Sequence, residues 1–146
     1  MATVSQLLTT KGQVVHTINK TATVFDAIGK MVQENVGALV VMDGMRPVGM
    51  FTERDYLRKI ALEGRSSRTT SVNDVMTGRL ISVELETEVE ACMAMMTEKR
   101  IRHLPVFAKG KMVGVVSIGD IVRHLASDRK QQIEQLTAYI QGVAYA

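Results

Sequence analysis

The sequence predicts an α+β fold made of two like units in tandem, followed by an extra helix. The main observation is an internal repeat, because His16–Ala61 aligns without a gap onto Ile81–Ala126 at an offset of 65 residues. The apolar pattern agrees widely along this alignment, and Asp55 coincides with Asp120. A second observation is size: a unit of roughly 60 residues is marginal by itself, so the two units are expected to pack on each other.

The first unit is predicted to contain a strand, a helix, two strands and a helix. β-branched residues indicate the first strand, and apolar residues at spacings of 3, 4 and 7 from Val24 indicate the helix, with Thr21 or Thr23 as its cap and Asn35 at its end. Asp43-Gly44 is a turn signal between two apolar runs. The expected elements are a short amphipathic turn at Val4–Leu8, strands at Val14–Ile18, Ala38–Met42 and Pro47–Phe51, and a final helix at Glu53–Leu62.

The second unit repeats this order after a polar linker at Glu63–Ser71. Its expected elements are a short helix at Val72–Met76, a strand at Leu80–Val83, a helix at Glu88–Lys99, a hairpin of His103–Phe107 and Met112–Val116, and a helix at Ile118–Ser127. A polar stretch then separates an extra helix, Gln131–Gln141, whose apolar face is expected to meet another chain. The predicted division is residues 1–65, 66–127 and 128–146.

Composition excludes several classes of protein. No apolar run approaches the ~20 residues of a membrane span, and Met1–Lys11 lacks the pattern of a signal peptide. The single Cys92 excludes an internal disulfide and suits a reducing compartment. The three His stand without metal-ligand companions, and no nucleophile triad or Walker-type loop is present. A cytoplasmic protein that needs no metal is therefore expected.

The clearest chemical signal is a hydroxyl residue followed by Asp, where a strand gives way to a helix. Thr52 precedes Asp55 in the first unit, and Ser117 precedes Asp120 in the second. A hydroxyl at this boundary is a natural N-cap, and the helix terminus behind it attracts phosphate. An Asp one turn later can accept two hydrogen bonds from a ribose diol. The pattern therefore allows two interpretations, helix caps alone or a nucleotide site.

The doubled unit and its motifs resemble a CBS-domain pair. The resemblance rests on the Gly-x-x-Thr-x-x-Asp and Gly-x-x-Ser-x-x-Asp endings and on Met76-Thr77. Segments Thr52–Lys59 and Ile101–Val106 are similar to stand-alone proteins of this family. The resemblance implies two units packed about a pseudo-two-fold axis, and adenine nucleotides bound in the clefts between them.

The resemblance also implies roles for individual residues. Thr52 and Ser117 would bind phosphate, and Asp55 and Asp120 would hold the ribose. The adenine would lie against Thr17 and Ile18 in the Ser117 site and against Ser82 and Val83 in the Thr52 site, and Gly37-Ala38 would leave room for the ring. Further phosphate contacts would come from Arg102 and His103 beside Ser117 and from Arg54 beside Thr52. Gly37 aligns with Arg102, so the two sites are not expected to be equivalent.

These features predict a non-catalytic sensor that binds AMP, ADP, ATP or NAD(H), with AMP or NAD as the favoured ligand. The expected assembly is a homodimer, without membrane contact, and the regulated enzyme would be a separate protein. The alternative is an RNA- or DNA-binding accessory protein that uses the basic patch of Arg54, Arg58, Lys59, Arg65 and Arg68. Net charge of +3 and few aromatic residues do not favour that alternative.

Overall fold

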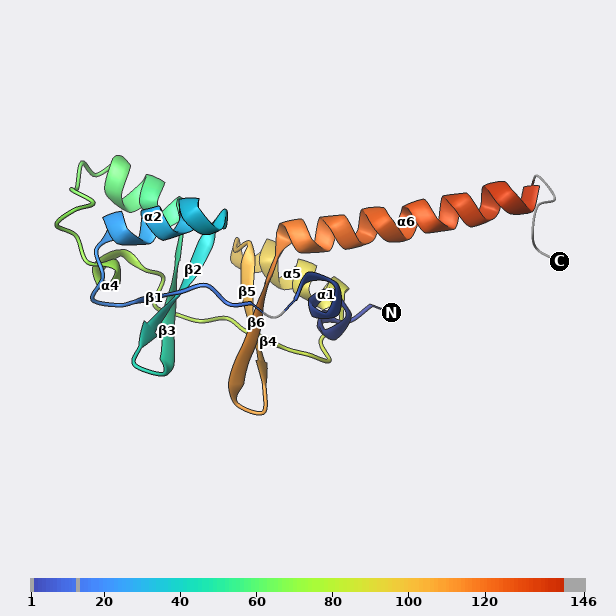
Figure 1. Ribbon diagram of the computed structural model, residues 1–146, viewed down its shortest axis with the longest axis horizontal. Helices are drawn as coiled ribbons and strands as arrows, with labels where there is room; N and C mark the ends of the chain where they lie inside the picture. The colour runs from blue at the N-terminus through green and yellow to red at the C-terminus, as the bar shows by residue number, and fades with distance from the viewer. Residues whose placement is uncertain (1, 13, 141–146) are drawn as a thin grey trace.

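The computed structural model describes residues 2–12 and 14–140 (Figure 1). The first part of the chain contains α1 (Val4–Lys11), β1 (Thr17–Asn19), α2 (Val24–Glu34), β2 (Ala38–Asp43), β3 (Arg46–Thr52), α3 (Glu53–Tyr56) and η1, a π-helical turn at Leu57–Ala61. The second part contains α4 (Val72–Val75), β4 (Val83–Glu84), α5 (Val89–Lys99), β5 (His103–Ala108), β6 (Lys111–Ser117) and α6 (Ile118–Ile140). The predicted α+β tandem is confirmed, with a long C-terminal helix.

Each unit holds a three-stranded sheet with the same topology. β1 runs parallel to β2 and β2 antiparallel to β3, and β4, β5 and β6 repeat this arrangement. Even the irregularities recur, because a register shift follows Val41 in β2 and Val106 in β5. These residues are 65 positions apart, so the repeat visible in the sequence extends to the local geometry of the strands.

The short helices α1 and α4 are exchanged between the units. Leu7 and Leu8 of α1 are buried in the core of the second unit, whereas Val72 and Val75 of α4 are buried in the core of the first. The backbone contacts correspond: the amide of Val4 donates to Thr87 O at 2.9 Å, and the amide of Val72 donates to Ala22 O at 2.9 Å. The predicted boundaries at residues 65 and 127 stay a prediction. In the structure, the exchanged helices α1 and α4 link the two units.

Two glycines allow α1 and the segment after α4 to approach the strands closely. A Cβ at Gly49 in β3 would lie 2.6 Å from Thr77 O, and a Cβ at Gly114 in β6 would lie 2.9 Å from Cδ2 of Leu8. Both contacts are closer than any side chain allows without movement. Glycine is therefore required at residue 49 by the close backbone oxygen, whereas at residue 114 the end of the Leu8 side chain would have to move.

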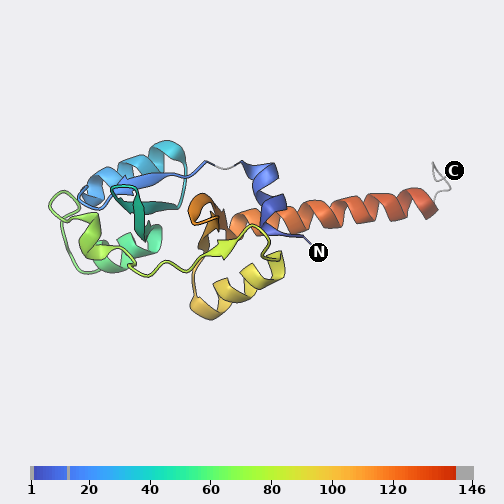
Figure 2. The same cartoon turned by 90° about the horizontal axis from the view of Figure 1, so that it is seen from below.

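A third apolar cluster joins the two sheets. Val40 and Met50 of the first unit are buried in it, and Met112 and Val115 of the second unit pack against it. The two hairpins accordingly lie side by side in Figure 1, and the view from below in Figure 2 shows α1 beside the base of α6. The two units thus form one body with a seam between their sheets.

The linker of the sequence prediction is anchored rather than loose. Thr70 is buried, and its carbonyl accepts a hydrogen bond from the amide of Val24 at 2.9 Å. The hydroxyl of Ser71 caps α4 by accepting from the amide of Asn73 at 3.2 Å. The guanidinium of Arg68 lies 4.0 Å from the ring centre of Phe25. The contacts of Thr70 and Arg68 therefore join the linker to the start of α2.

Several local predictions are confirmed and others need correction. Thr23, not Thr21, caps α2 by accepting from the amide of Asp26, and Asn35 ends that helix in the left-handed region. The amphipathic turn at Val4–Leu8 is instead a helix that continues to Lys11. The outer strands β1 and β4 are shorter than predicted, with three and two residues. No helix within residues 2–12 and 14–140 is long and apolar enough to cross a membrane.

The largest correction concerns the C-terminal region. The predicted break between Ser127 and Gln131 does not exist, because α6 runs without interruption from Ile118 to Ile140. Arg129, Lys130 and Gln131 are good helix formers, and neither Gly nor Pro interrupts the stretch. The far half of α6 projects away from both units (Figure 1), and Gln141, the predicted last residue, lies outside the described residues.

Candidate functional site

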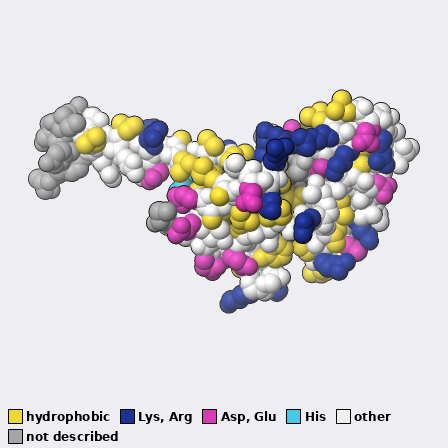
Figure 3. Space-filling view, turned by 180° about the vertical axis from the view of Figure 1, so that it is seen from behind, with side chains coloured by type: hydrophobic (Ala, Val, Ile, Leu, Met, Phe, Trp, Pro, Cys, Tyr) yellow, Lys and Arg dark blue, Asp and Glu magenta, His cyan; other side chains and the backbone are white. Residues whose placement is uncertain are grey.

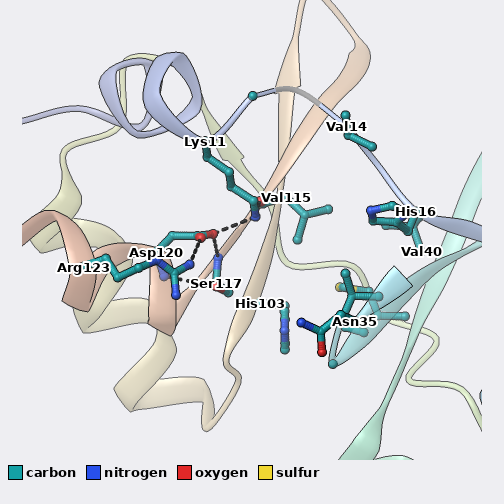
Figure 4. A pocket seen from close by; sticks show the side chains of 15 residues that line it. Lys11, Val14, His16, Asn35, Val40, His103, Val115, Ser117, Asp120 and Arg123 are labelled. Carbon is teal, nitrogen blue, oxygen red and sulfur yellow. Dashed lines mark hydrogen bonds and ion pairs between the residues drawn. The ribbon is translucent and has the colours of Figure 1, made fainter. Parts of the chain in front are cut away.

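A cavity of about 350 Å³ lies at the seam between the two units (Figure 4). It is lined by the end of α1, by the segment that leads to β1, by the start of β2, and by β5, β6 and α6. The lining residues are Lys11, Gly12, Val14, His16, Asn35, Val36, Gly37, Ala38, Val40, Met50, His103, Val115, Ser117, Asp120 and Arg123. Five of the residues predicted from the sequence are therefore brought together here, namely Gly37, Ala38, His103, Ser117 and Asp120.

The Ser117–Asp120 pair caps α6. The backbone amide of Ser117 donates to Oδ2 of Asp120 at 2.8 Å, and the amide of Asp120 donates to Oγ of Ser117 at 3.2 Å. This reciprocal arrangement satisfies two amides that the first turn of a helix leaves without partners. The interpretation of these residues as caps is thus correct, and both residues also line the cavity.

Two cations hold the Asp120 carboxylate. Nζ of Lys11 lies 2.7 Å from Oδ2, and Nη2 of Arg123 lies 2.7 Å from Oδ1 (Figure 4). Lys11 Nζ also donates to the carbonyl of Val115 at 2.6 Å. Burial by itself raises the pKa of the Asp120 carboxyl, but the hydrogen bonds from Lys11 and Ser117 outweigh it, so the pKa falls below its ordinary value. The carboxylate is therefore ionised at neutral pH.

His103 faces the same cavity from β5. Burial, followed by the positive charge of Lys11, lowers the pKa of its imidazole, although the Asp120 carboxylate opposes this shift. The ring lies close to Gly37, since a Cβ at residue 37 would be 3.8 Å from its Cε1 and 2.7 Å from Oε1 of Glu53. His103 is thus a neutral, half-buried donor or acceptor at physiological pH.

Three residues predicted for this site lie elsewhere. Thr17 and Ile18 are in β1, where the carbonyl of Thr17 accepts from Nζ of Lys30 and the side chain of Ile18 packs against the first core. The chain just before them, at Val14 and His16, lines the cavity in their place. Arg102 is exposed outside the cavity, and its carbonyl accepts from the amide of Ile118 at 2.9 Å.

The Thr52 motif has a different environment. Thr52 and Asp55 cap α3 reciprocally, as their counterparts cap α6. The buried Asp55 carboxylate then contacts Nζ of Lys59 at 3.1 Å and accepts from Oγ1 of Thr77 at 3.3 Å. Its partners therefore come from the neighbouring turn of the helix and from the α4 segment. The two motifs are alike in sequence but not in their contacts.

The other residues predicted beside Thr52 do not converge on it through their side chains. Arg54 and Ser82 are exposed. Val83 is 5% exposed and belongs to the core of the second unit, so its side chain cannot contact a ligand in this conformation. The physical reason is strand alternation, which points this residue inward.

Sequence reasoning missed Lys11, His16, Asn35 and Arg123. Arg123 carried a signal, because it follows Asp120 at the i+3 position on a helix and repeats Arg58. Lys11 carried none, since it lies 109 residues from Asp120. Lys and Arg side chains also gather on the surface at the junction of the two units (Figure 3). Within the described part of the chain, no group of three or more His, Cys, Asp or Glu could hold a metal ion.

Comparison with protein families identifies the repeat. The family model described as "CBS domain" matches the sequence twice, at residues 4–62 and at residues 72–127. The chain is similar to "CBS domain-containing protein CBSX3, mitochondrial" of Arabidopsis thaliana, at 50% identity over 125 residues that span 82% of this chain and 61% of the relative. It is also similar to "CBS domain-containing protein YhcV" of Bacillus subtilis, at 32% identity over 83% of this chain and 84% of the relative. The chain thus spans about three fifths of the length of the Arabidopsis protein.

Solved structures give the same result. A putative signal-transduction protein with CBS domains from Burkholderia ambifaria superposes with a TM-score of 0.84 at 44% identity, covering 87% of this chain and 96% of that one. Hypoxic Response Protein I, solved with two coordinated zinc ions, superposes with a TM-score of 0.69 at 26% identity, covering 85% and 99%. The repeat, the fold and these matches together show that the chain belongs to the CBS-domain family and carries two CBS domains in tandem.

Proposed function

We propose that the protein is a non-catalytic regulatory sensor that binds an adenine nucleotide in the cavity at Ser117 and Asp120. The chain carries two CBS domains, and CBS-domain proteins are generally regulatory and bind adenine nucleotides. The observation that carries the proposal is the convergence of a capped helix terminus, an ionised Asp120 and two cations on one cavity. The cavity volume falls within the range of small-molecule sites.

Each part of a nucleotide has a chemically suitable group in this cavity. Asp120 supplies acceptor oxygens for a ribose diol, and the hydroxyl of Ser117 lies at the helix N-terminus, where the dipole favours phosphate. Val40, Met50 and Val115 give the cavity apolar surface that suits a base. Lys11 and Arg123 provide positive charge for one or more phosphates. AMP or NAD is the ligand we favour, with ADP and ATP as further candidates.

The proposal assigns the stronger site to Ser117. At the Thr52 motif, Asp55 is engaged by Lys59 and Thr77, and the side chain of Val83 is in the core. We expect a second nucleotide, if one binds there, to be held through Thr52, Asp55 and Arg54 and to bind more weakly. The structure of the chain thus favours two unequal sites over two equivalent ones.

We further propose that the chain acts as a homodimer that contacts its regulated partner as a separate protein. Ile118, Val122, Leu125, Ile133 and Leu136 lie on one side of α6 and are each between 36% and 61% exposed. The stripe continues onto the projecting half of α6, where Ile133 and Leu136 are the most exposed of the five and lie away from the rest of the described chain (Figures 1 and 3). A second copy of the chain carries the same apolar stripe along its own α6, so it is the partner that best matches this surface.

Fewer observations bear on the compartment and on the alternative function than on the nucleotide site. The expected cytoplasmic location stays a prediction, because one relative is named as mitochondrial. The absence of a metal requirement also stays a prediction, since a relative was solved with zinc ions. Nothing in the comparisons supports binding of RNA or DNA, and the basic patch is divided, with Arg68 over Phe25 and Lys59 on Asp55.

Thermal unfolding in the presence of AMP, ADP, ATP and NAD tests the proposal. A nucleotide present at 100 times its dissociation constant should raise the free energy of unfolding by about 2.7 kcal/mol. The matched control is Asp120→Asn, which keeps the size of the side chain and removes its charge, and which should lose most of the shift. A wild-type protein whose melting temperature is unchanged by all four nucleotides would contradict the proposal.

A further inference from the structure

Nearly all acceptor positions of Asp120 are already engaged within the protein. Oδ2 accepts from the amide of Ser117 at 2.8 Å and from Nζ of Lys11 at 2.7 Å, and Oδ1 accepts from Arg123 at 2.7 Å. A carboxylate offers about four lone-pair sites, and three are used here. A ribose diol that donates two hydrogen bonds needs two sites. At least one of the two cations must therefore leave Asp120 before the diol can bind.

We propose that Lys11 is a specificity-determining residue that makes this cavity select phosphorylated nucleosides over unphosphorylated ones. This inference rests on the proposed function and deepens it. In this proposal the ribose displaces both cations from Asp120: the guanidinium of Arg123 returns to water, and the ammonium group of Lys11 pairs with a phosphate of the same ligand. The cation is exchanged from one anion to another, so its charge stays paired only if the ligand brings an anion of its own.

Burial explains why the exchange at Lys11 discriminates between ligands. The side chain of Lys11 is 35% exposed and also donates to the carbonyl of Val115 at 2.6 Å, which holds Nζ at the cavity wall. A neutral nucleoside would displace this ammonium from its carboxylate and leave a partly desolvated charge without an anionic partner, which is costly. A phosphate removes that cost because it accepts a charge-assisted hydrogen bond from Lys11.

Arg123 is the weaker discriminator of the two. Its side chain is 74% exposed, so its guanidinium can return to water when Asp120 is taken by a ligand. Lys11 cannot withdraw in the same way, because Leu7 and Leu8 on the same short helix are buried in the core of the second unit. The docking of α1 on that unit therefore places the ammonium group at the cavity and keeps it there.

The test compares adenosine, AMP and ADP by isothermal titration on the full chain. For the wild type, AMP and ADP should bind at least tenfold more tightly than adenosine. Lys11→Met should change the two affinities in opposite directions. Adenosine should bind severalfold more tightly, because Asp120 is released from Lys11. AMP should bind about tenfold more weakly, a change equivalent to about 1.4 kcal/mol. Lys11→Arg, which keeps the charge, should restore the preference for AMP.

Two controls separate this role from a structural one. Lys99→Met removes a lysine that lies outside the cavity at the end of α5, and it should leave all three affinities unchanged. Melting temperatures of the Lys11 variants without ligand report whether α1 still docks, and Lys11→Gln, which keeps a donor for Val115, serves if Lys11→Met does not fold.

The outcomes are distinct. Equal losses for adenosine and AMP in Lys11→Met would overturn the inference and leave nucleotide binding intact, and so would a wild type that binds both equally. A wild type that binds none of the three ligands, nor ATP or NAD, would overturn the proposed function together with this inference.

Discussion

Nζ of Lys11 lies 2.7 Å from Oδ2 of Asp120, across 109 residues of sequence. The contact joins the last turn of α1 to the first turn of α6, and it is possible only because α1 packs on the second unit. The first unit adds Gly37 and Ala38 to the lining of the cavity. The candidate site is therefore built from three separate parts of the chain, and changes in the position of α1 should be coupled to its occupancy.

Replacing the two aspartates tests the ribose assignment. Asp120→Asn and Asp55→Asn should each weaken binding at one site by roughly 1.5–3 kcal/mol, because each removes a charged acceptor of hydrogen bonds. Titration of both variants with AMP gives the affinity and the stoichiometry. Alanine is less suitable, since the buried Asp120 also caps α6 and its removal should cost about 1 kcal/mol of stability. Wild-type binding by both variants would show that neither carboxylate holds the ribose.

The arginines near the cavity should contribute more to binding affinity when the ligand carries more phosphates. Arg102→Ala is expected to weaken ADP more than adenosine, because a guanidinium binds phosphate oxygens and not the base. Arg102 is exposed and does not line the cavity, whereas Arg123 does. The loss of ADP affinity relative to the loss of adenosine affinity should therefore be larger in Arg123→Ala than in Arg102→Ala. Titration of ADP and adenosine against both variants measures it. Equal losses for both ligands would assign the arginine a structural role.

Glycine replacements test the exchange of the short helices. Gly49→Ala should lower the free energy of unfolding by about 1–3 kcal/mol, because the new methyl group would lie 2.6 Å from a backbone oxygen of Thr77. Gly114→Ala should cost less, because its nearest neighbour is the movable end of Leu8. Gly29→Ala is the control: it lies in α2 with nothing within 4 Å and should stabilise by about 0.5–1 kcal/mol. Chemical denaturation measures all three, and equal costs at Gly49 and Gly114 would refute the ranking.

His103 should make stability depend on pH on the acid side of neutrality. Its pKa in the folded protein lies below the ordinary value of 6.5, owing to burial and to the charge of Lys11. As pH falls through 6.5, the unfolded chain binds a proton that the folded protein does not, so the free energy of unfolding decreases until the folded pKa is reached. Asp120 opposes this shift and Arg102 adds to it.

His103→Asn should flatten this dependence on the acid side of pH 7, because residue 103 then no longer binds a proton in the unfolded chain. Urea unfolding at several pH values measures the effect. His124→Asn, which removes a histidine outside the cavity, is the matched control. A wild-type slope in His103→Asn would show that this imidazole does not contribute.

The projecting half of α6 should hold the dimer. Ile133→Glu with Leu136→Glu should shift the chain toward monomer and lower its melting temperature, because each fully buried large apolar residue is worth about 1.5–3 kcal/mol. Deletion of residues 130–146 should act in the same way, whereas Gln131→Glu on the polar side should not. Sedimentation velocity at micromolar concentration measures the assembly. A monomeric wild type would contradict the prediction, and a stable dimer after deletion would move the interface to the helices of the units.

The sequence by itself determined the features that depend on local pattern. The repeat predicted two like sheets, and even the irregularity after Val41 and Val106 follows it. The hydroxyl-x-x-Asp spacing predicted the caps of both helices, because a cap needs only neighbours three residues apart. The apolar stripe from Val24 predicted the buried face of α2, since helical period alone decides which side is apolar.

Only the tertiary structure decided which surfaces those local elements meet. An amphipathic helix such as α1 carries an apolar face that suits either sheet, and only the structure shows that it packs on the second unit, with Leu8 against Gly114. The same packing places Lys11 on Asp120, a contact for which sequence spacing holds no signal. The Lys11 ion pair that distinguishes Asp120 from Asp55 arises in this way, because similar motifs acquire different partners once the helices around them have packed.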